Sequence, residues 1–168
     1  MGVFAFRMSR ASSLSTDPRA LAVARRYLRY GTRSVSELRA YLSSRGVSED
    51  AIADVVRACE RAGALDDRVC AKLVAATRAA KGYASGSIRE HLAGKGLARG
   101  VVESAVRSIQ AETTDEERAR TVVRTRLSRR PEASGRLRAS LTRALARRGF
   151  DEELIDRVLR EALGAEDA

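Results

Sequence analysis

Aromatic residues are scarce in this chain of 168 residues, and tryptophan is absent. Phe, Tyr and Trp together make up 4% of the residues, so any core must be built from Leu, Val, Ile and Ala. A core of that kind in a unit of about 50 residues buries little surface and is only marginally stable alone. We therefore expect small units of this chain to depend on their neighbours, or on a partner, for stability.

Metal ligands are equally few. The chain has two cysteines, Cys59 and Cys70, and a single histidine, His91. A tetrahedral metal site needs about four Cys, His or carboxylate ligands at suitable spacing, and neither cysteine belongs to a Cys-x-x-Cys pair. We expect no metal and no other cofactor, and two reduced core cysteines of the kind found in cytoplasmic proteins.

The sequence contains no recognisable catalytic constellation, so we do not expect an enzyme. His91 lies within a predicted helix, where a surface residue is commoner than a general base. Asp66 and Asp67 form a carboxylate pair, but their place at a predicted helix start makes them capping residues. The predicted loop from Gly82 to Gly86 lacks the Gly-Lys-Ser/Thr ending of a phosphate-binding loop.

No secretory signal or membrane span is visible. The first residues hold a four-residue apolar stretch, Val3 to Phe6, which Arg7 ends. A signal peptide needs about 7–15 apolar residues and a membrane span about 18 or more. We expect a soluble cytoplasmic protein that does not bind membranes, with residues 1–18 as a flexible N-terminal tail.

Proline occurs only at Pro18 and Pro131, and no segment alternates apolar and polar residues with the period of a strand. Everything after Pro18 is therefore predicted to be helical. Three of the predicted helices, which we expect to open successive units, run over about 19–30, 67–80 and 115–129.

One pattern of apolar residues and glycine occurs three times, at relative positions 0, 4, 8, 9, 14 and 18. The copies are Leu38, Leu42, Gly46, Val47, Ile52 and Val56; Ile88, Leu92, Gly96, Leu97, Val102 and Val106; and Leu141, Leu145, Gly149, Phe150, Ile155 and Leu159. They begin 50 and 53 residues apart, a spacing typical of tandem modules. We predict an all-α fold of three tandem three-helix modules, at 19–64, 65–112 and 113–164, which form an elongated, curved array.

Residues at the predicted helix ends support this organisation. Ser34 with Glu37, and Thr114 with Glu117, match the capping box that begins a helix. Each module also has a glycine directly after a basic residue, where a second helix should end in a left-handed turn. These glycines are Gly46, Gly96 and Gly149.

The formal net charge of +10 is concentrated in one segment. Residues 118–148 contain eleven arginines and one acidic residue, Glu132, whereas the rest of the chain is close to neutral. A field of one sign favours an anionic partner, either nucleic acid or an acidic protein surface. A run of charge is also often only a solvated face, so this second interpretation stays open. The arginines that we expect to bind a partner or DNA are Arg124, Arg126, Arg129, Arg130, Arg147 and Arg148, with a weaker second patch at Arg25, Arg26 and Arg29.

The two helices joined by a glycine turn also invite comparison with a DNA-reading helix-turn-helix. Three copies would be unusual in one operator-binding domain. The third helices of the first and last modules, at about 51–61 and 152–161, are rich in acidic residues, which phosphates would repel. Any phosphate contact is therefore expected from the first two helices of the third module.

Taken together, these motifs resemble the RecX family, the bacterial regulators of the RecA recombinase. Residues 34–47 resemble the first module of that family, and residues 63–67 (Gly-Ala-Leu-Asp-Asp) resemble its junction motif. Residues 95–97 and 147–150 resemble its Lys-Gly and Arg-Arg-Gly-Phe turns. The resemblance covers about residues 19–164.

The resemblance implies a regulator of homologous recombination and DNA repair in the SOS response. Such proteins bind the RecA–DNA filament along its groove, bridge neighbouring protomers, and suppress ATP hydrolysis, strand exchange and co-protease action. The expected partner is thus the RecA filament, with DNA as part of it, and we also expect a monomer. Two alternatives stay open: a basic architectural DNA-binding protein without a recombinase partner, and a helical scaffold for an unrelated partner.

Overall fold

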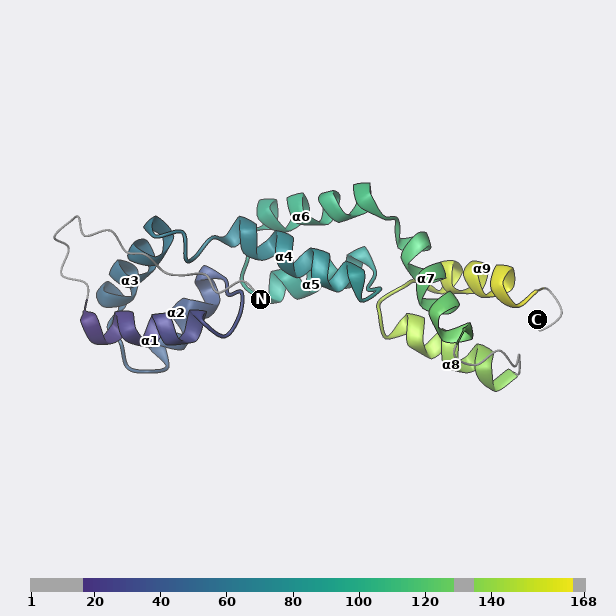
Figure 1. Ribbon diagram of the computed structural model, residues 1–168, viewed down its shortest axis with the longest axis horizontal. Coiled ribbons are helices and arrows are strands. Elements are labelled where there is room, and N and C mark those ends of the chain that lie inside the picture. Colours follow the sequence, from purple (N-terminus) through teal and green to yellow (C-terminus); the bar gives the residue numbers. More distant parts are fainter. Residues whose placement is uncertain (1–16, 129–134, 165–168) are drawn as a thin grey trace.

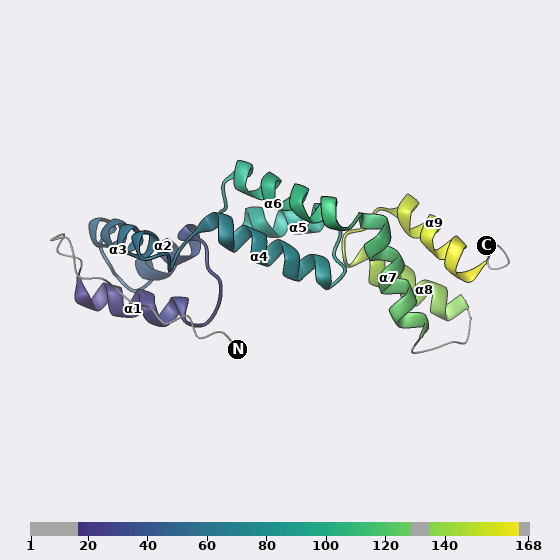
Figure 2. The same cartoon turned by 45° about the horizontal axis from the view of Figure 1, so that its top comes forward.

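The computed structural model describes residues 17–128 and 135–164, and within those ranges every regular element is a helix. The helices are α1 (Pro18–Leu28), α2 (Val35–Ser43), α3 (Glu49–Arg61), α4 (Asp67–Ala80), α5 (Ser85–Gly94), α6 (Arg99–Glu112), α7 (Asp115–Leu127), α8 (Gly135–Ala146) and α9 (Glu152–Leu163). They form three groups of three along an elongated, gently arched molecule (Figures 1 and 2). The prediction of an all-α fold of tandem helical modules is confirmed.

Some predicted helix ends are shifted in the structure. Helix α1 begins at Pro18 rather than at residue 19, because the Asp17 carboxylate accepts a hydrogen bond from the Arg19 N–H at 2.9 Å and caps the helix there. The predicted ends of α1 and α7 lay about two residues too far along the chain. The predicted loop that closes at Gly86 is wrong, because α5 already begins at Ser85.

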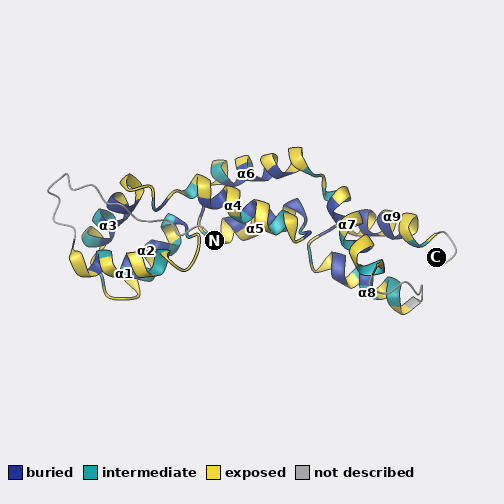
Figure 3. Cartoon of the chain, viewed as in Figure 1, coloured by how far each residue is buried: buried dark blue, intermediate teal, exposed yellow. Residues whose placement is uncertain are grey.

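Each group of helices encloses its own small apolar core. The extensive helix–helix contacts lie within α1–α3, within α4–α6 and within α7–α9. In every group the buried faces turn toward one another and the outer faces are exposed (Figure 3). Leu38, Leu92 and Leu145 are fully buried at the centres of the three cores, and each such side chain contributes about 1.5–3 kcal/mol on burial.

Two residues of the predicted second module are buried in the core of a neighbouring group. Leu65, just past the predicted end of the first module, is buried in the core of α1–α3. Ala84, which directly precedes α5, is buried in the core of α7–α9. Residues at the junctions thus complete the core of a neighbouring group, while the module limits themselves stay a prediction.

The predicted helix-end residues have their expected roles. The capping boxes at Ser34 and Thr114 are both formed. Gly46, Gly96 and Gly149 have φ angles of 75°, 72° and 82°, so all three adopt the left-handed conformation that other residues avoid. Local sequence therefore specifies where these helices begin and end.

Candidate functional site

Helix α7 carries two of the predicted partner-binding arginines on different sides. Ala119 and Val123 of α7 are buried against the neighbouring helices of its group. Arg124 is exposed, and Arg126, two residues later, projects from another side of the helix and is half-buried. Neither side chain has an ion pair within the described part of the chain. The two arginines therefore offer free positive charge but do not form one compact cluster.

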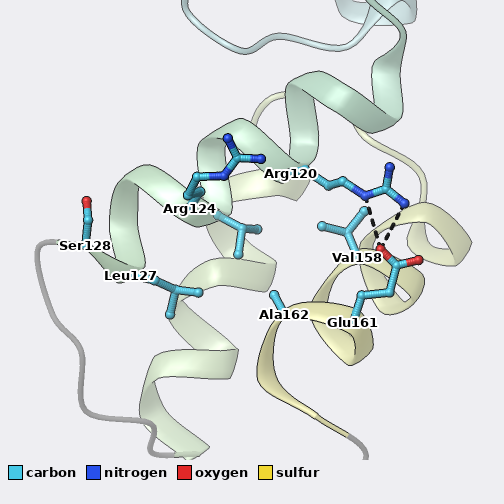
Figure 4. Close-up of a pocket in the computed structure, with 8 residues that line it drawn as sticks. Arg120, Arg124, Leu127, Ser128, Val158, Glu161 and Ala162 are labelled. Atoms are coloured by element: carbon cyan, nitrogen blue, oxygen red, sulfur yellow. Dashed lines mark hydrogen bonds and ion pairs between the residues drawn. The ribbon is translucent and has the colours of Figure 1, made fainter.

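A shallow groove of about 440 Å³ lies between α7 and α9, beside Arg124 (Figure 4). Val123 and Leu127 of α7, together with Val158 and Ala162 of α9, supply its apolar surface. Arg120, Arg124, Ser128 and Glu161 supply its polar surface. The groove is thus apolar with charge at its edge.

Much of the positive charge in this group is neutralised internally. Arg120 lies 2.6 Å from Glu116 on its own helix and 3.0 Å from Glu161 on α9. The hydrogen bond to Glu161 raises the pKa of the Arg120 guanidinium, although burial acts in the opposite direction. Arg157 also pairs with Glu116, at 3.5 Å. The acidic helix α9 therefore neutralises part of the positive charge of the arginine-rich segment. The net charge of that segment alone did not predict these ion pairs.

Arg118 is the one arginine of α7 that is fully buried, at 4% exposure. Its guanidinium pairs with Asp115 and donates hydrogen bonds to the Ser85 hydroxyl at 2.7 Å and to the Tyr83 carbonyl at 3.1 Å. It belongs to the junction between the second and third groups and not to a binding surface. Alignment of α7 with α4 at their first residues places Arg118 opposite the buried Cys70, a signal that could have identified it.

The predicted pair Arg147 and Arg148 is divided in the same way. Arg147 is exposed in the turn between α8 and α9. Arg148 is half-buried, donates to the Ala144 carbonyl at 2.9 Å and to the Lys81 carbonyl at 3.4 Å, and lies 6.0 Å from the ring centre of Tyr83. Arg148 thus links the second and third groups. The predicted residues Arg129 and Arg130 lie outside the described part of the chain.

The second predicted patch lies at the opposite end of the molecule, on α1 (Figure 1). Arg25, Arg26 and Arg29 are all exposed there. The guanidinium of Arg29 lies 5.6 Å from the ring centre of Tyr30. Helices α4–α6 separate this patch from the arginines of α7, so the structure does not bring the two predicted patches together.

The junction between the first two groups is polar and closely fitted. The Lys95 ammonium lies 2.7 Å from each carboxylate oxygen of Glu37. The Ser34 hydroxyl donates to the Lys95 carbonyl at 2.6 Å, and the Val35 N–H donates to Asp67 at 2.8 Å. Sequence reasoning assigned Asp67 to helix capping alone and missed its contact with α2.

The junction between the last two groups repeats part of this arrangement. The Ser85 N–H donates to Asp115 at 2.9 Å, as the Val35 N–H does to Asp67 in the first junction. The Ala84 N–H donates to the Arg148 carbonyl at 3.0 Å. In both junctions, the start of the second helix of one group is thus bonded to two parts of the next group. These parts are the first helix of that group and the glycine turn that follows its second helix. These contacts hold the first group, with the arginines of α1, apart from the third group, with the arginines of α7.

The remaining titratable groups of note in the described part of the chain are one histidine and two cysteines. His91 is largely exposed on α5, and its pKa is lowered by partial desolvation of the ring and by the charges of Arg78 and Lys95. Cys59 and Cys70 are free and buried, and burial raises the pKa of both thiols. Among the described residues, no group of three or more His, Cys, Asp and Glu could hold a metal ion. A search of the same residues finds no helix long and apolar enough to cross a membrane.

Three helical groups held together at polar junctions define an all-α protein of the helical-repeat class. Family profiles make the assignment specific: "RecX, first three-helix domain" matches residues 20–59, and "RecX, third three-helix domain" matches residues 114–159. The chain belongs to the RecX family.

Individual relatives agree with this assignment. Regulatory protein RecX of Pseudomonas putida is 32% identical over 123 residues, which cover 73% of this chain and 78% of the relative. Regulatory protein RecX of Mycobacterium ulcerans is 30% identical over 158 residues, which cover 92% of this chain and 91% of the relative. These relatives support a regulatory role for the chain.

Solved structures show the same fold. The crystal structure of RecX from Lactobacillus salivarius has a TM-score of 0.65 and 21% identity to this chain, covering 85% of this chain and 94% of that one. A second crystal structure, of a regulatory protein RecX, has a TM-score of 0.63 and 19% identity, covering 91% and 81%. At 21% and 19% sequence identity, these structural similarities support the fold alone.

Proposed function

We propose that this protein binds RecA filaments assembled on DNA and restrains them, by inhibiting ATP hydrolysis, strand exchange and co-protease activity. The observation that carries the proposal is the free positive charge near both ends of an elongated array, at Arg26 on α1 and at Arg124 on α7. A filament presents a repeated, anionic surface, and linked contacts at two ends gain from a high effective concentration. The family assignment supports the same role.

In this proposal the protein acts by binding and catalyses no reaction. The expected contact residues remain those predicted from the sequence, with Arg124, Arg126 and Arg147 carrying free charge and Arg148 acting through the junction. Arg25, Arg26 and Arg29 form the second contact. The proposed state is a cytoplasmic monomer that needs no cofactor.

The test is a titration of the protein into RecA on single-stranded DNA while ATP hydrolysis is followed. Inhibition at less than one molecule per RecA protomer is expected, because a molecule bound to the filament affects several protomers. Full ATPase activity at equimolar protein would contradict the proposal.

A basic architectural DNA-binding protein is the second candidate, favoured by the arginine-rich surfaces. This function predicts strong binding to duplex DNA without RecA, and the logarithm of affinity should fall with the logarithm of salt by about 0.9 per phosphate neutralised. A gel-shift series from low to high salt separates the two functions. Strong duplex binding without any effect on RecA would favour the architectural role.

A further inference from the structure

Tyrosine and arginine are concentrated together in the first helical group. Residues 18–36 contain five arginines and no acidic residue. Of the four tyrosines in the chain, Tyr27, Tyr30 and Tyr41 belong to this group, although aromatic residues make up only 4% of the sequence. The patch on α7 has free arginines but no tyrosine. The two ends of the molecule are therefore chemically different.

Two of these tyrosines stack on each other and have an arginine over each outer face. The rings of Tyr27 and Tyr41 are nearly parallel, with centres 4.0 Å apart and an angle of 10° between their planes. The guanidinium of Arg33 lies 4.7 Å from the Tyr27 ring centre, and that of Arg45 lies 5.0 Å from the Tyr41 ring centre. Because the rings cover each other on one face, the guanidinium groups cover the outer faces. Arg45 is exposed, so its guanidinium lies at an open end of this column of two rings and two guanidinium groups.

Tyr30 lies beside this column, one helical turn after Tyr27, and its N–H donates to the Tyr27 carbonyl. The Tyr30 side chain is 73% exposed, the most of any large apolar residue among those described. Arg29 lies over its ring. Tyr30 therefore presents an exposed aromatic ring in a segment whose charges are all positive.

We propose that this surface, formed by Tyr30, Arg45 and the neighbouring α1 arginines, binds single-stranded nucleic acid by stacking its bases. Tyr30 supplies a ring face for one base, Arg45 supplies a guanidinium plane for another, and Arg26 attracts the phosphates. Base stacking on aromatic rings beside a basic surface is the usual way in which proteins hold single strands without reading their sequence. In a duplex the base faces are covered, so the same rings have little to bind. The site shares the α1 arginines with the proposed filament contact, but it assigns them a ligand, single-stranded nucleic acid, that they can hold without the recombinase.

The experiment measures the anisotropy of a fluorescein-labelled oligonucleotide of about twenty thymidines, and of a duplex of equal length, with the full chain at low salt. Tyr30→Ala is expected to weaken single-strand binding about tenfold, while Tyr30→Phe keeps the ring and changes it less than about twofold. Duplex binding should be nearly unchanged in both variants. Leu73→Ala is the matched control, because Leu73 is also an exposed apolar residue, at 51%, but lies on α4.

A second readout uses the absence of tryptophan, which leaves tyrosine emission unmasked. Bases that stack on Tyr30 should quench this emission, and the quenching should be smaller in Tyr30→Ala. Since Tyr30 is largely exposed, the variant should fold normally, and its thermal unfolding checks this.

Unchanged single-strand affinity in Tyr30→Ala, or an equal loss for single strand and duplex, would overturn the stacking site. Loss of RecA inhibition with unchanged DNA affinity would assign Tyr30 to a protein contact and would also overturn it. Inhibition of RecA ATPase by the unmodified chain is measured separately, so failure of the stacking site and failure of the filament proposal can be told apart.

Discussion

The ammonium group of Lys95 lies 2.7 Å from both carboxylate oxygens of Glu37, although the two residues are 58 positions apart in the chain. Both side chains are largely buried, with 13% and 24% of their surfaces exposed. Glu37 also closes the capping box by accepting a hydrogen bond from the Ser34 N–H at 2.9 Å. One carboxylate thus begins α2 and fastens the first helical group to the second.

This contact predicts an acid-sensitive junction. Burial raises the pKa of Glu37, but the hydrogen bonds from Lys95 and Ser34 and the charges of Lys95 and Arg33 outweigh it and lower the pKa below the ordinary 4.5. The stabilisation is therefore present above pH 4.5 and is lost as the pH falls through the folded-state pKa. Glu37→Gln should lower the free energy of unfolding by about 1–3 kcal/mol at neutral pH and by less in acid, as measured by urea unfolding.

The control for this prediction is Glu49→Gln. Glu49 pairs with Arg39 but is 76% exposed, so its loss should change stability by less than about 1 kcal/mol at either pH. An effect of Glu37→Gln that is the same at neutral and acid pH would contradict the predicted linkage.

The glycine turns give a prediction about the fit of the first junction. Gly46 and Gly96 have nearly the same φ, 75° and 72°, so alanine is strained equally at both. A methyl group at Gly96 would also collide with Ser36 of the preceding group, whereas at Gly46 nothing lies within 4 Å. Gly46→Ala should therefore cost about 1 kcal/mol and Gly96→Ala clearly more.

Thermal unfolding of the two variants, followed by circular dichroism, measures this difference. Equal losses of stability would show that the junction can yield around the added methyl group, and would contradict the close fit between α2 and the second glycine turn.

The second junction depends on a buried charge. Replacing Arg118 by Leu leaves Asp115 and the Tyr83 carbonyl without their buried partner and should cost about 3–5 kcal/mol in urea unfolding. Arg120→Leu is the comparison, since Arg120 also has acidic partners but its side chain is 43% exposed, and the expected loss of stability is much smaller than for Arg118→Leu. Similar costs for both would mean that Arg118 is not the structural residue of α7.

The proposed filament contact predicts a functional effect of the free arginines on α7. The double substitution of Arg124 and Arg126 by Ala should raise the concentration for half-inhibition of RecA ATPase about three- to tenfold, with little change in unfolding. The control removes the same charge from α6, by replacing the exposed Arg99 and Arg107 with Ala. If inhibition is unchanged in the α7 variant, these arginines are only a solvated face.

Much of the fold could be predicted from the sequence, because its signals are local. The capping boxes at Ser34 and Thr114 and the left-handed turn at Gly96 involve residues close in the chain, and they lie where the pattern placed them. The loop predicted to close at Gly86 was wrong, since α5 begins without a side-chain cap that the sequence could reveal.

The candidate site was harder to predict, because the state of each arginine depends on distant partners. Arg118, Arg120 and Arg124 lie on one short helix and look alike in the sequence. In the structure Arg118 is buried with Ser85 of the preceding group, Arg120 pairs with Glu161 of α9, and Arg124 is exposed. The tyrosine–arginine column was missed for the same reason, since Tyr27 and Tyr41 meet only when α1 packs on α2.

The sequence by itself determined the helices, most of their ends and their threefold repetition, because apolar period, caps and glycine turns act within a few residues. Only the tertiary structure decided which charges are free and how the groups are joined. Packing brings Lys95 to Glu37 and Arg118 to Ser85, and so removes those charges from the surface. Arg124 and Arg126 have no ion pair in the described part of the chain, and they are among the residues that we propose for binding.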